Sequence, residues 1–207
     1  IILDIKLIMN LQEEYYKRKD IIKKRLEDFS KIKDDDIFYE ACFCILTPQS
    51  SAKKCWGAVL QLKENDFLNK NFNSLEILSD KTRFHINKSK YLLELKEKWP
   101  SLKTKLNEIK NAKELREFLV NNVKGYGYKE ASHFLRNIGY RNLAILDRHI
   151  LKNLHNLNII QELPKTLTKK KYFEIEQKFI DFSKNVNIDI DELDLLFWSQ
   201  ETGEIFK

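Results

Sequence analysis

Val123-Lys124-Gly125-Tyr126-Gly127-Tyr128-Lys129-Glu130-Ala131 separates two segments whose apolar residues recur at helical spacing. The two glycines permit positive φ angles and close backbone approach, so the stretch predicts a tight turn between two helices. Two glycines can also make an ordinary helix-helix connection, and Gly-x-Gly alone favours that simpler interpretation. Lys129, beside the turn, favours the more specific interpretation of residues 112–138 as a helix-hairpin-helix.

The remainder of the chain is also predicted to be helical. Only five glycines and three prolines occur among 207 residues, and runs with the alternating pattern of a strand are almost absent. Helical spacing or turn residues mark further helices at 11–29, 37–46, 52–62, 85–99 (ending before Pro100), 112–122, 148–156, 169–183 and 191–200. We expect an all-α protein.

Composition sets broad limits on the function. A hydrophobic fraction of 43% and a charged fraction of 33% are typical of a globular protein, and the net charge of +6 favours a polyanionic partner without requiring one. The opening Ile1-Ile2-Leu3 run is interrupted before it could form a signal peptide, so we expect an intracellular protein. The odd number of cysteines indicates buried free thiols; they are Cys42, Cys44 and Cys55.

Lys129 stands at the predicted start of the second hairpin helix. The exposed backbone amides there can donate hydrogen bonds to a phosphate, which favours a hairpin that binds the DNA backbone. The positive end of a helix disfavours a cation, and only the neutral form of an amine is a nucleophile. Lys129 is therefore a candidate nucleophile.

Asp147 lies in Leu146-Asp147-Arg148-His149-Ile150, where it is a candidate cap for the next helix. Capping alone could explain this aspartate. A carboxylate can also stabilise the oxocarbenium-like sugar that forms as a base departs, through its charge rather than through a covalent bond. Asp147 therefore has two interpretations, and its pairing with Lys129 favours the catalytic one.

The segments Gly125-Tyr126-Gly127-Tyr128-Lys129 and Leu146-Asp147-Arg148-His149 resemble the paired signatures of the helix-hairpin-helix DNA glycosylase superfamily. Members with an iron–sulfur cluster end in four cysteines, whereas no cysteine follows Cys55 here. The stretch 129–137, the compact length and the final Lys207 resemble the small type-2 8-oxoguanine DNA glycosylases. The resemblance extends over almost the whole chain.

This resemblance implies a fold and a reaction. Residues 1–207 are expected to form one glycosylase unit of two helical subdomains with the active-site cleft between them, the N-terminal and C-terminal helices sharing the second subdomain. Lys129 is expected to attack C1′ of the damaged nucleotide and form a Schiff base that permits strand cleavage by β-elimination. Asp147 is expected to be the essential carboxylate. The implied partner is double-stranded DNA containing oxidised guanine, bound by a monomer without cofactor or metal.

The resemblance also assigns residues to lesion recognition. Gln49 matches a polar loop residue inserted beside the orphaned base, although it could be a surface glutamine in a turn. Phe84 and Trp198 match aromatic residues that hold the flipped base, although either could belong to the core. The base acquires an N7–H donor on oxidation, and Asp194 and the terminal carboxylate at Lys207 are alternative acceptors. The expected contacts with DNA are Gln49, Gly125, Gly127, Tyr128 and His149.

Two rival hypotheses remain. A glycosylase of the same fold for another damaged base would share Lys129 and Asp147. It would differ at Phe84, Asp194, Trp198 and the C-terminus. A non-catalytic helix-hairpin-helix module would explain the Gly125–Gly127 turn but not the joint presence of lysine and aspartate. The sequence therefore favours the nucleophile more strongly than it favours the substrate.

Overall fold

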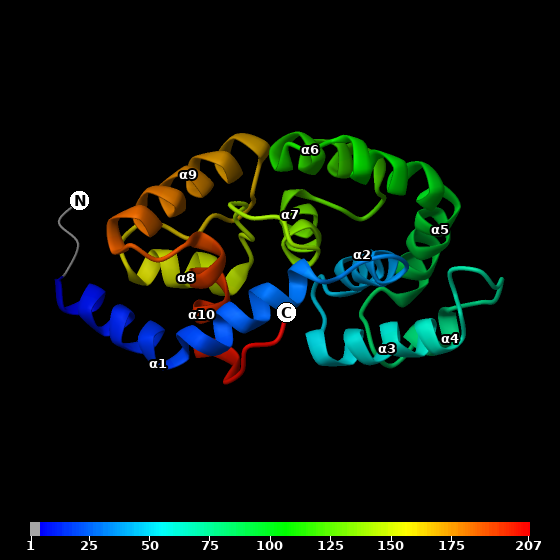
Figure 1. The fold of residues 1–207 in the computed structure, drawn as a ribbon, viewed down its shortest axis with the longest axis horizontal. Coiled ribbons are helices and arrows are strands. Elements are labelled where there is room, and N and C mark those ends of the chain that lie inside the picture. The colour runs from blue at the N-terminus through cyan, green and yellow to red at the C-terminus, as the bar shows by residue number, and fades with distance from the viewer. Residues whose placement is uncertain (1–4) are drawn as a thin grey trace. The chain divides into compact units, whose positions relative to one another are not determined.

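The computed structural model of the protein describes residues 5–207, and every regular element in that range is an α-helix (Figure 1). The predicted all-α class is confirmed. The helices are α1 (Ile5–Ser30), α2 (Asp36–Leu46), α3 (Ala52–Glu64), α4 (Leu75–Leu78), α5 (His85–Glu108), α6 (Ala112–Asn122), α7 (Tyr128–Asn137), α8 (Arg148–Asn156), α9 (Lys169–Val186) and α10 (Ile190–Thr202). The Ile1-Ile2-Leu3 run lies outside the described residues. Within them, no helix combines the length and the apolar character needed to cross a membrane.

The helices form two compact units. The central unit comprises residues 32–138 and contains α2 to α7. The terminal unit comprises the residues up to 31 together with 139–207, and it contains α1 and α8 to α10. Lys129 belongs to the central unit and Asp147 to the terminal unit, so the predicted catalytic pair has one residue in each unit.

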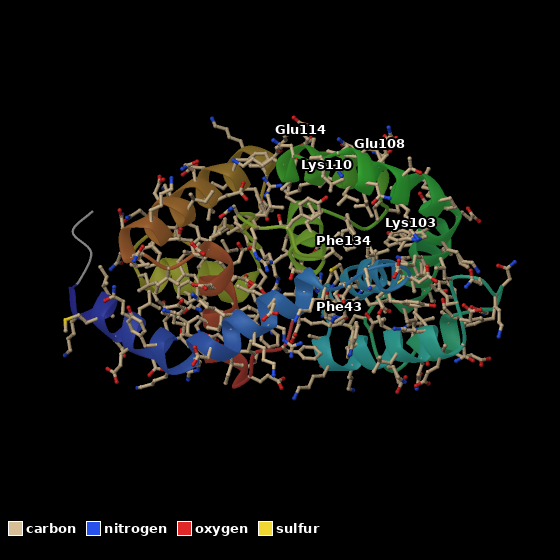
Figure 2. The ribbon with its side chains drawn as sticks, viewed as in Figure 1. Phe43, Lys103, Glu108, Lys110, Glu114 and Phe134 are labelled. Atoms are coloured by element: carbon tan, nitrogen blue, oxygen red, sulfur yellow. The ribbon has the colours of Figure 1, made fainter. Side chains whose placement is uncertain are left out.

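The central unit is built around α2, whose residues from Phe38 to Leu46 are all buried. The helices α3, α5 and α7 pack against it. Phe43 of α2 and Phe134 of α7 lie in the interior (Figure 2). By contrast, Glu114 of α6 and Lys110, which precedes that helix, are exposed. Cys42, Cys44 and Cys55 are buried and form no disulfide, as predicted.

Helix α5 is longer than predicted. It continues through Pro100 to Glu108, so the predicted end before the proline is wrong. The apolar stripe explains the difference, because Trp99 and Leu102 are both buried while Pro100 is exposed. A proline inside a helix removes one backbone hydrogen bond, here to the carbonyl of Lys96, and the burial of the stripe outweighs that loss.

The terminal unit is built around α10, which is buried from Ile190 to Phe197 and contacts α1, α8 and α9. The Tyr15 hydroxyl of α1 donates a hydrogen bond of 2.7 Å to the Glu192 carboxylate of α10. Helix α8 has its predicted bounds, and α9 and α10 extend a few residues beyond theirs. The buried helix α10 therefore fixes the helices on which the aspartate side of the predicted site is built.

We predict that Pro100→Ala stabilises the protein. Alanine restores the amide that can donate to the Lys96 carbonyl, and it adds helix propensity on an exposed face of α5. The free energy of unfolding should rise by about 1–3 kcal/mol, measured by urea denaturation. A lower free energy of unfolding in the variant would show that α5 depends on the bend that a proline imposes.

Candidate active site

The predicted hairpin is formed by α6 and α7 with a turn at Gly125. Its φ of +89° is a left-handed conformation, and a Cβ there would lie 2.8 Å from the ring of Tyr91. Gly127 lacks the predicted positive φ, since its φ is −102°, but a Cβ there would lie only 3.2 Å from Oε2 of Glu130. The turn requires only one left-handed residue, and Gly127 instead caps α7 in an extended conformation. There its amide donates a hydrogen bond of 3.1 Å to the Glu130 carboxylate.

Lys129 is the second residue of α7, at the amino end of the helix as predicted. Its side chain is 22% exposed, and its Nζ lies 3.6 Å from Oε1 of Glu130. The other carboxylate oxygen of Glu130 accepts the Gly127 amide, so one side chain holds both the turn and the amine. Sequence reasoning did not single out Glu130, although an acidic residue at the third position of a helix is a known capping signal.

Tyr128 connects the two hairpin helices. Its hydroxyl donates a hydrogen bond of 2.8 Å to the Glu117 carboxylate of α6, and the Arg116 guanidinium lies 5.8 Å from the centre of its ring. The first backbone amides of α7 have no acceptor within the helix, as at every helix amino end. The side chain of Tyr128 thus fixes the hairpin, and its contact with DNA stays a prediction.

Gln49 and Phe84 both adopt left-handed backbone conformations, with φ of +55° and +57°. Residues other than glycine rarely adopt this backbone conformation. Where they do, surrounding contacts must hold them in it. Phe84 precedes the first residue of α5, and the residue is 54% exposed. The Arg83 guanidinium lies 5.3 Å from the centre of that ring. Phe84 therefore does not belong to the core.

Lys88 is buried beside these two residues, with only 5% of its surface exposed. Burial lowers its pKa to about 8, and the positive charges of Lys129 and Arg83 act in the same direction. Electrostatic interactions with Cys55 and Glu130 oppose this shift. The ammonium of Lys88 is thus a cation of the central unit whose electrostatic surroundings include the predicted nucleophile.

Asp147 caps α8, as predicted. Its Oδ1 accepts hydrogen bonds of 2.8 Å from the amides of both His149 and Ile150. The hydrogen bonds from these two backbone amides to Oδ1 hold the carboxylate. Within the described part of the terminal unit, no hydrogen bond to Oδ2 is formed. One oxygen therefore fulfils the structural role of Asp147, and the cap does not use the other.

A salt bridge joins α8 to α10. Lys152 Nζ lies 2.9 and 3.0 Å from the two carboxylate oxygens of Glu201, and this contact is the main cause that lowers the pKa of Glu201. His149 Nδ1 lies 3.8 Å from the same carboxylate, and Arg148 Nε lies 3.2 Å from His149 Nε2. His149, next to Asp147, thus lies between the Glu201 carboxylate and the Arg148 guanidinium. The contacts of Glu201 and Lys152 were not predicted from the sequence.

The remaining predicted residues lie on or after α10. Asp194 is buried, and Trp198, one helical turn later, is partly exposed. Gly203, with a φ of +83°, ends the helix, and the chain then runs to the partly exposed Lys207. Both alternative acceptors, Asp194 and the terminal carboxylate, therefore belong to the same unit as Trp198 and Asp147. Among residues 5–207, no group of three or more metal-ligating side chains is present.

A tight left-handed turn, a row of helix amino-terminal amides and a partly exposed lysine among them define a protein of the helix-hairpin-helix class. Comparison with known proteins identifies the family. The family model for 8-oxoguanine DNA glycosylase matches residues 22–188. The chain belongs to this family, which confirms the resemblance predicted from the sequence.

Curated relatives support the assignment over nearly their whole length. A Fusobacterium nucleatum protein named 8-oxoguanine DNA glycosylase/AP lyase is 47% identical over 95% of this chain and 96% of its own. A Methanocaldococcus jannaschii protein of the same name is 42% identical over 91% of this chain and 93% of its own.

Solved structures agree with the assignment. The M. jannaschii 8-oxoguanine glycosylase/lyase in complex with a 15mer DNA containing 8-oxoguanine matches with a TM-score of 0.89 at 38% identity, covering 98% of this chain and all (100%) of that chain. The 8-oxoguanine DNA glycosylase of Thermotoga maritima matches with a TM-score of 0.88 at 30% identity, covering 98% and 99% of the two chains.

Two glycine variants test the hairpin geometry. Gly125 and Gly203 have similar positive φ, but a Cβ would meet Tyr91 only at Gly125 and has open space at Gly203. Gly203→Ala should cost roughly 1–2 kcal/mol in the free energy of unfolding, from the left-handed backbone alone. Gly125→Ala should cost more and should also weaken binding to undamaged duplex DNA. Equal losses of stability and unchanged binding in Gly125→Ala would contradict this account of the turn.

The burial of Lys88 predicts a pH dependence of stability. The folded protein releases this proton near pH 8, whereas an unfolded lysine keeps it to about pH 10.5. Between these values the unfolded state binds the additional proton, so raising the pH favours the folded state. The free energy of unfolding of the wild type, minus that of Lys88→Met, should rise across this window in urea titrations. A difference that stays constant or falls would show that Lys88 is not a buried cation.

Proposed function

We propose that this protein removes 8-oxoguanine from double-stranded DNA and then cleaves the strand at the resulting abasic site. The observation that carries the proposal is the placement of Lys129, a partly exposed amine at the amino end of the hairpin helix, in a member of the 8-oxoguanine DNA glycosylase family. An enzyme with both glycosylase and lyase activity needs a nucleophile, and Lys129 supplies an amine at the amino end of α7. Because the substrate is DNA, we place the activity inside the cell.

Lys129 is the proposed nucleophile. Its neutral Nζ attacks C1′, the bond from C1′ to the base breaks, and the electron pair leaves with the base. A proton then passes from nitrogen to the ring oxygen O4′ as the C1′–O4′ bond breaks, which opens the sugar and gives a protonated Schiff base. Removal of a C2′ proton then expels the 3′ phosphate by β-elimination and nicks the strand. The Glu130 carboxylate, whose Oε1 lies 3.6 Å from Nζ, holds the amine at this end of α7.

Asp147 is the proposed electrostatic partner. Positive charge develops on the sugar as the base departs, and a fixed carboxylate stabilises it without covalent bonding. The hydrogen bonds from the amides of His149 and Ile150 to Oδ1 prevent the side chain from rotating away, which preserves the charge of the carboxylate at one position. The cap therefore supports the catalytic role rather than competing with it.

The other predicted residues take roles in binding. Gly125, Gly127 and Tyr128 line the DNA backbone, where hairpin amides other than that of Gly127, which donates to Glu130, bind phosphate. His149 contacts DNA beside Asp147. The exposed, left-handed Gln49 and Phe84 reach the lesion from the central unit. Trp198 stacks on the flipped base, and either Asp194 or the carboxylate of Lys207 accepts its N7–H. These alternatives differ in residue type, so Asp194→Asn and removal of Lys207 distinguish them by the selectivity for 8-oxoguanine over guanine.

Borohydride trapping tests the nucleophile. We expect the wild-type protein to form a covalent adduct with a duplex containing 8-oxoguanine and to lose it in Lys129→Gln, because glutamine cannot form a Schiff base. Lys124→Gln, on the exposed side of the same hairpin, is the matched control and should still be trapped. Absence of an adduct in the wild type would refute the lyase and favour a module that only binds DNA.

The same trapping assay identifies the base. A panel of duplexes with different damaged bases should show the fastest adduct formation with 8-oxoguanine. Faster reaction with another lesion would keep Lys129 and Asp147 in their roles but assign the protein to a different substrate. The panel therefore separates an error in the substrate from an error in the mechanism.

Asp147 variants separate charge from capping. Asparagine caps a helix about as well as aspartate, so Asp147→Asn should keep the stability and DNA affinity of the wild type. It should slow base removal by about 100-fold or more, because the lost interaction is with charge in the transition state. Asp147→Ala should additionally lose about 1 kcal/mol of stability. Single-turnover excision and urea denaturation measure the two effects, and near-normal excision by Asp147→Asn would reduce the aspartate to a cap.

A further inference from the structure

Lys88 joins the two segments that present Gln49 and Phe84. Its Nζ donates hydrogen bonds of 2.8 Å to the carbonyls of Leu46 and Pro48, which flank the start of the Gln49 loop. It donates another of 2.8 Å to the hydroxyl of Thr82, two residues before Phe84. One buried ammonium therefore contacts the end of α2, the Gln49 loop and the segment that enters α5.

Hydroxyl groups complete this arrangement. Ser50 Oγ lies 3.2 Å from Lys88 Nζ and 2.9 Å from Thr82 Oγ1, and it accepts a hydrogen bond of 2.9 Å from the Arg83 amide. The Thr82 hydroxyl also contacts the Leu46 carbonyl at 2.8 Å. We call Lys88, Ser50, Thr82 and the carbonyls of Leu46 and Pro48 the Lys88 cluster. It links residues far apart in the sequence directly beside both left-handed residues.

Burying a lysine without function is unfavourable, because the charge loses its hydration and the long side chain loses its freedom. The acceptors of the Lys88 cluster are carbonyl and hydroxyl oxygens, which satisfy the donors of the ammonium without neutralising it. The carbonyl of Leu46 ends α2, where the helix dipole favours a cation. Such a cation is well suited to hold strained segments, since charge-assisted hydrogen bonds are about twice as strong as neutral ones.

We infer that Lys88 is a positioning residue for lesion recognition, which sets the joint geometry of Gln49 and Phe84 through the Lys88 cluster. This inference rests on the proposed function, in which both side chains contact the damaged site. A strained residue needs surroundings that hold it, and here one ammonium supplies them for two such residues. Loss of the cluster should therefore impair recognition of the base more than it impairs the chemistry at Lys129.

The test compares two DNA substrates. Lys88→Met keeps a long unbranched side chain, one atom shorter, and removes its donors. Lys90→Met, at an exposed position of the same helix, is the control. With 8-oxoguanine DNA, Lys88→Met should reduce single-turnover excision by about tenfold to 100-fold, as a misplaced contact does. With a preformed abasic site, which has no base to recognise, its borohydride trapping should stay within about threefold of the wild type. Lys90→Met should resemble the wild type on both substrates.

Two results would overturn the inference. Unchanged excision by a folded Lys88→Met protein would show that the cluster is not needed for recognition. An equal loss on both substrates would mean that Lys88 acts through Lys129 or through general stability. Thr82→Val removes the central hydroxyl without changing the charge, so it should show the same division between the substrates. If Lys88→Met does not fold, Thr82→Val decides the question in the same way.

Hydrogen exchange gives an outcome that does not depend on activity. The amide of Ser50 donates to the Thr47 carbonyl at 3.0 Å, and the amide of Arg83 donates to Ser50 Oγ at 2.9 Å. Both amides should exchange about tenfold faster in Lys88→Met, and neither should change in Lys90→Met. If the wild type acts on no 8-oxoguanine substrate, the proposed function fails, and unchanged exchange at both amides would still separately refute the positioning role.

Discussion

The electrostatic asymmetry of the α-helix is the constraint on which the candidate site depends. The amino end of a helix carries partial positive charge and amides without internal acceptors. Lys129 at the start of α7 and Asp147 at the start of α8 occupy the same kind of position with opposite charge. The amino end of α7 carries Lys129, whose Nζ lies 3.6 Å from the Glu130 carboxylate, and the amino end of α8 fixes the Asp147 carboxylate. Both residues of the proposed catalytic pair are thus positioned at helix amino ends.

The carboxyl end of a helix supplies the complementary case. The Leu46 carbonyl at the end of α2 attracts donors, and the central unit places the Lys88 ammonium and the Thr82 hydroxyl against it. The negative helix end helps to offset the cost of burying this lysine, which burial nevertheless leaves with a lowered pKa. The stable termination of a core helix and the placement of two exposed, strained residues therefore depend on the same cation.

Much of this could be predicted from local signals, and the failures have local causes. The Asp147 cap and the bounds of α6 and α8 follow from residue types that act within one helical turn. Pro100 misled the prediction because the buried stripe of α5 acts over the whole helix. The position of Lys88 was detectable, since it lies one turn before the buried Leu92 and so continues that stripe. Its partners were not, because they come from segments whose approach only the folded chain determines.

Asp147 shows why a structural and a catalytic interpretation of one residue need not compete. A carboxylate has two oxygens, and the cap uses one of them twice, through the amides of His149 and Ile150. A flexible aspartate would have to be ordered when the sugar becomes positively charged, and ordering it then would raise the barrier. Because the cap orders it during folding, the charge is already in place. The cap that makes Asp147 look ordinary in the sequence is therefore also what would prepare it for the catalytic role that we propose.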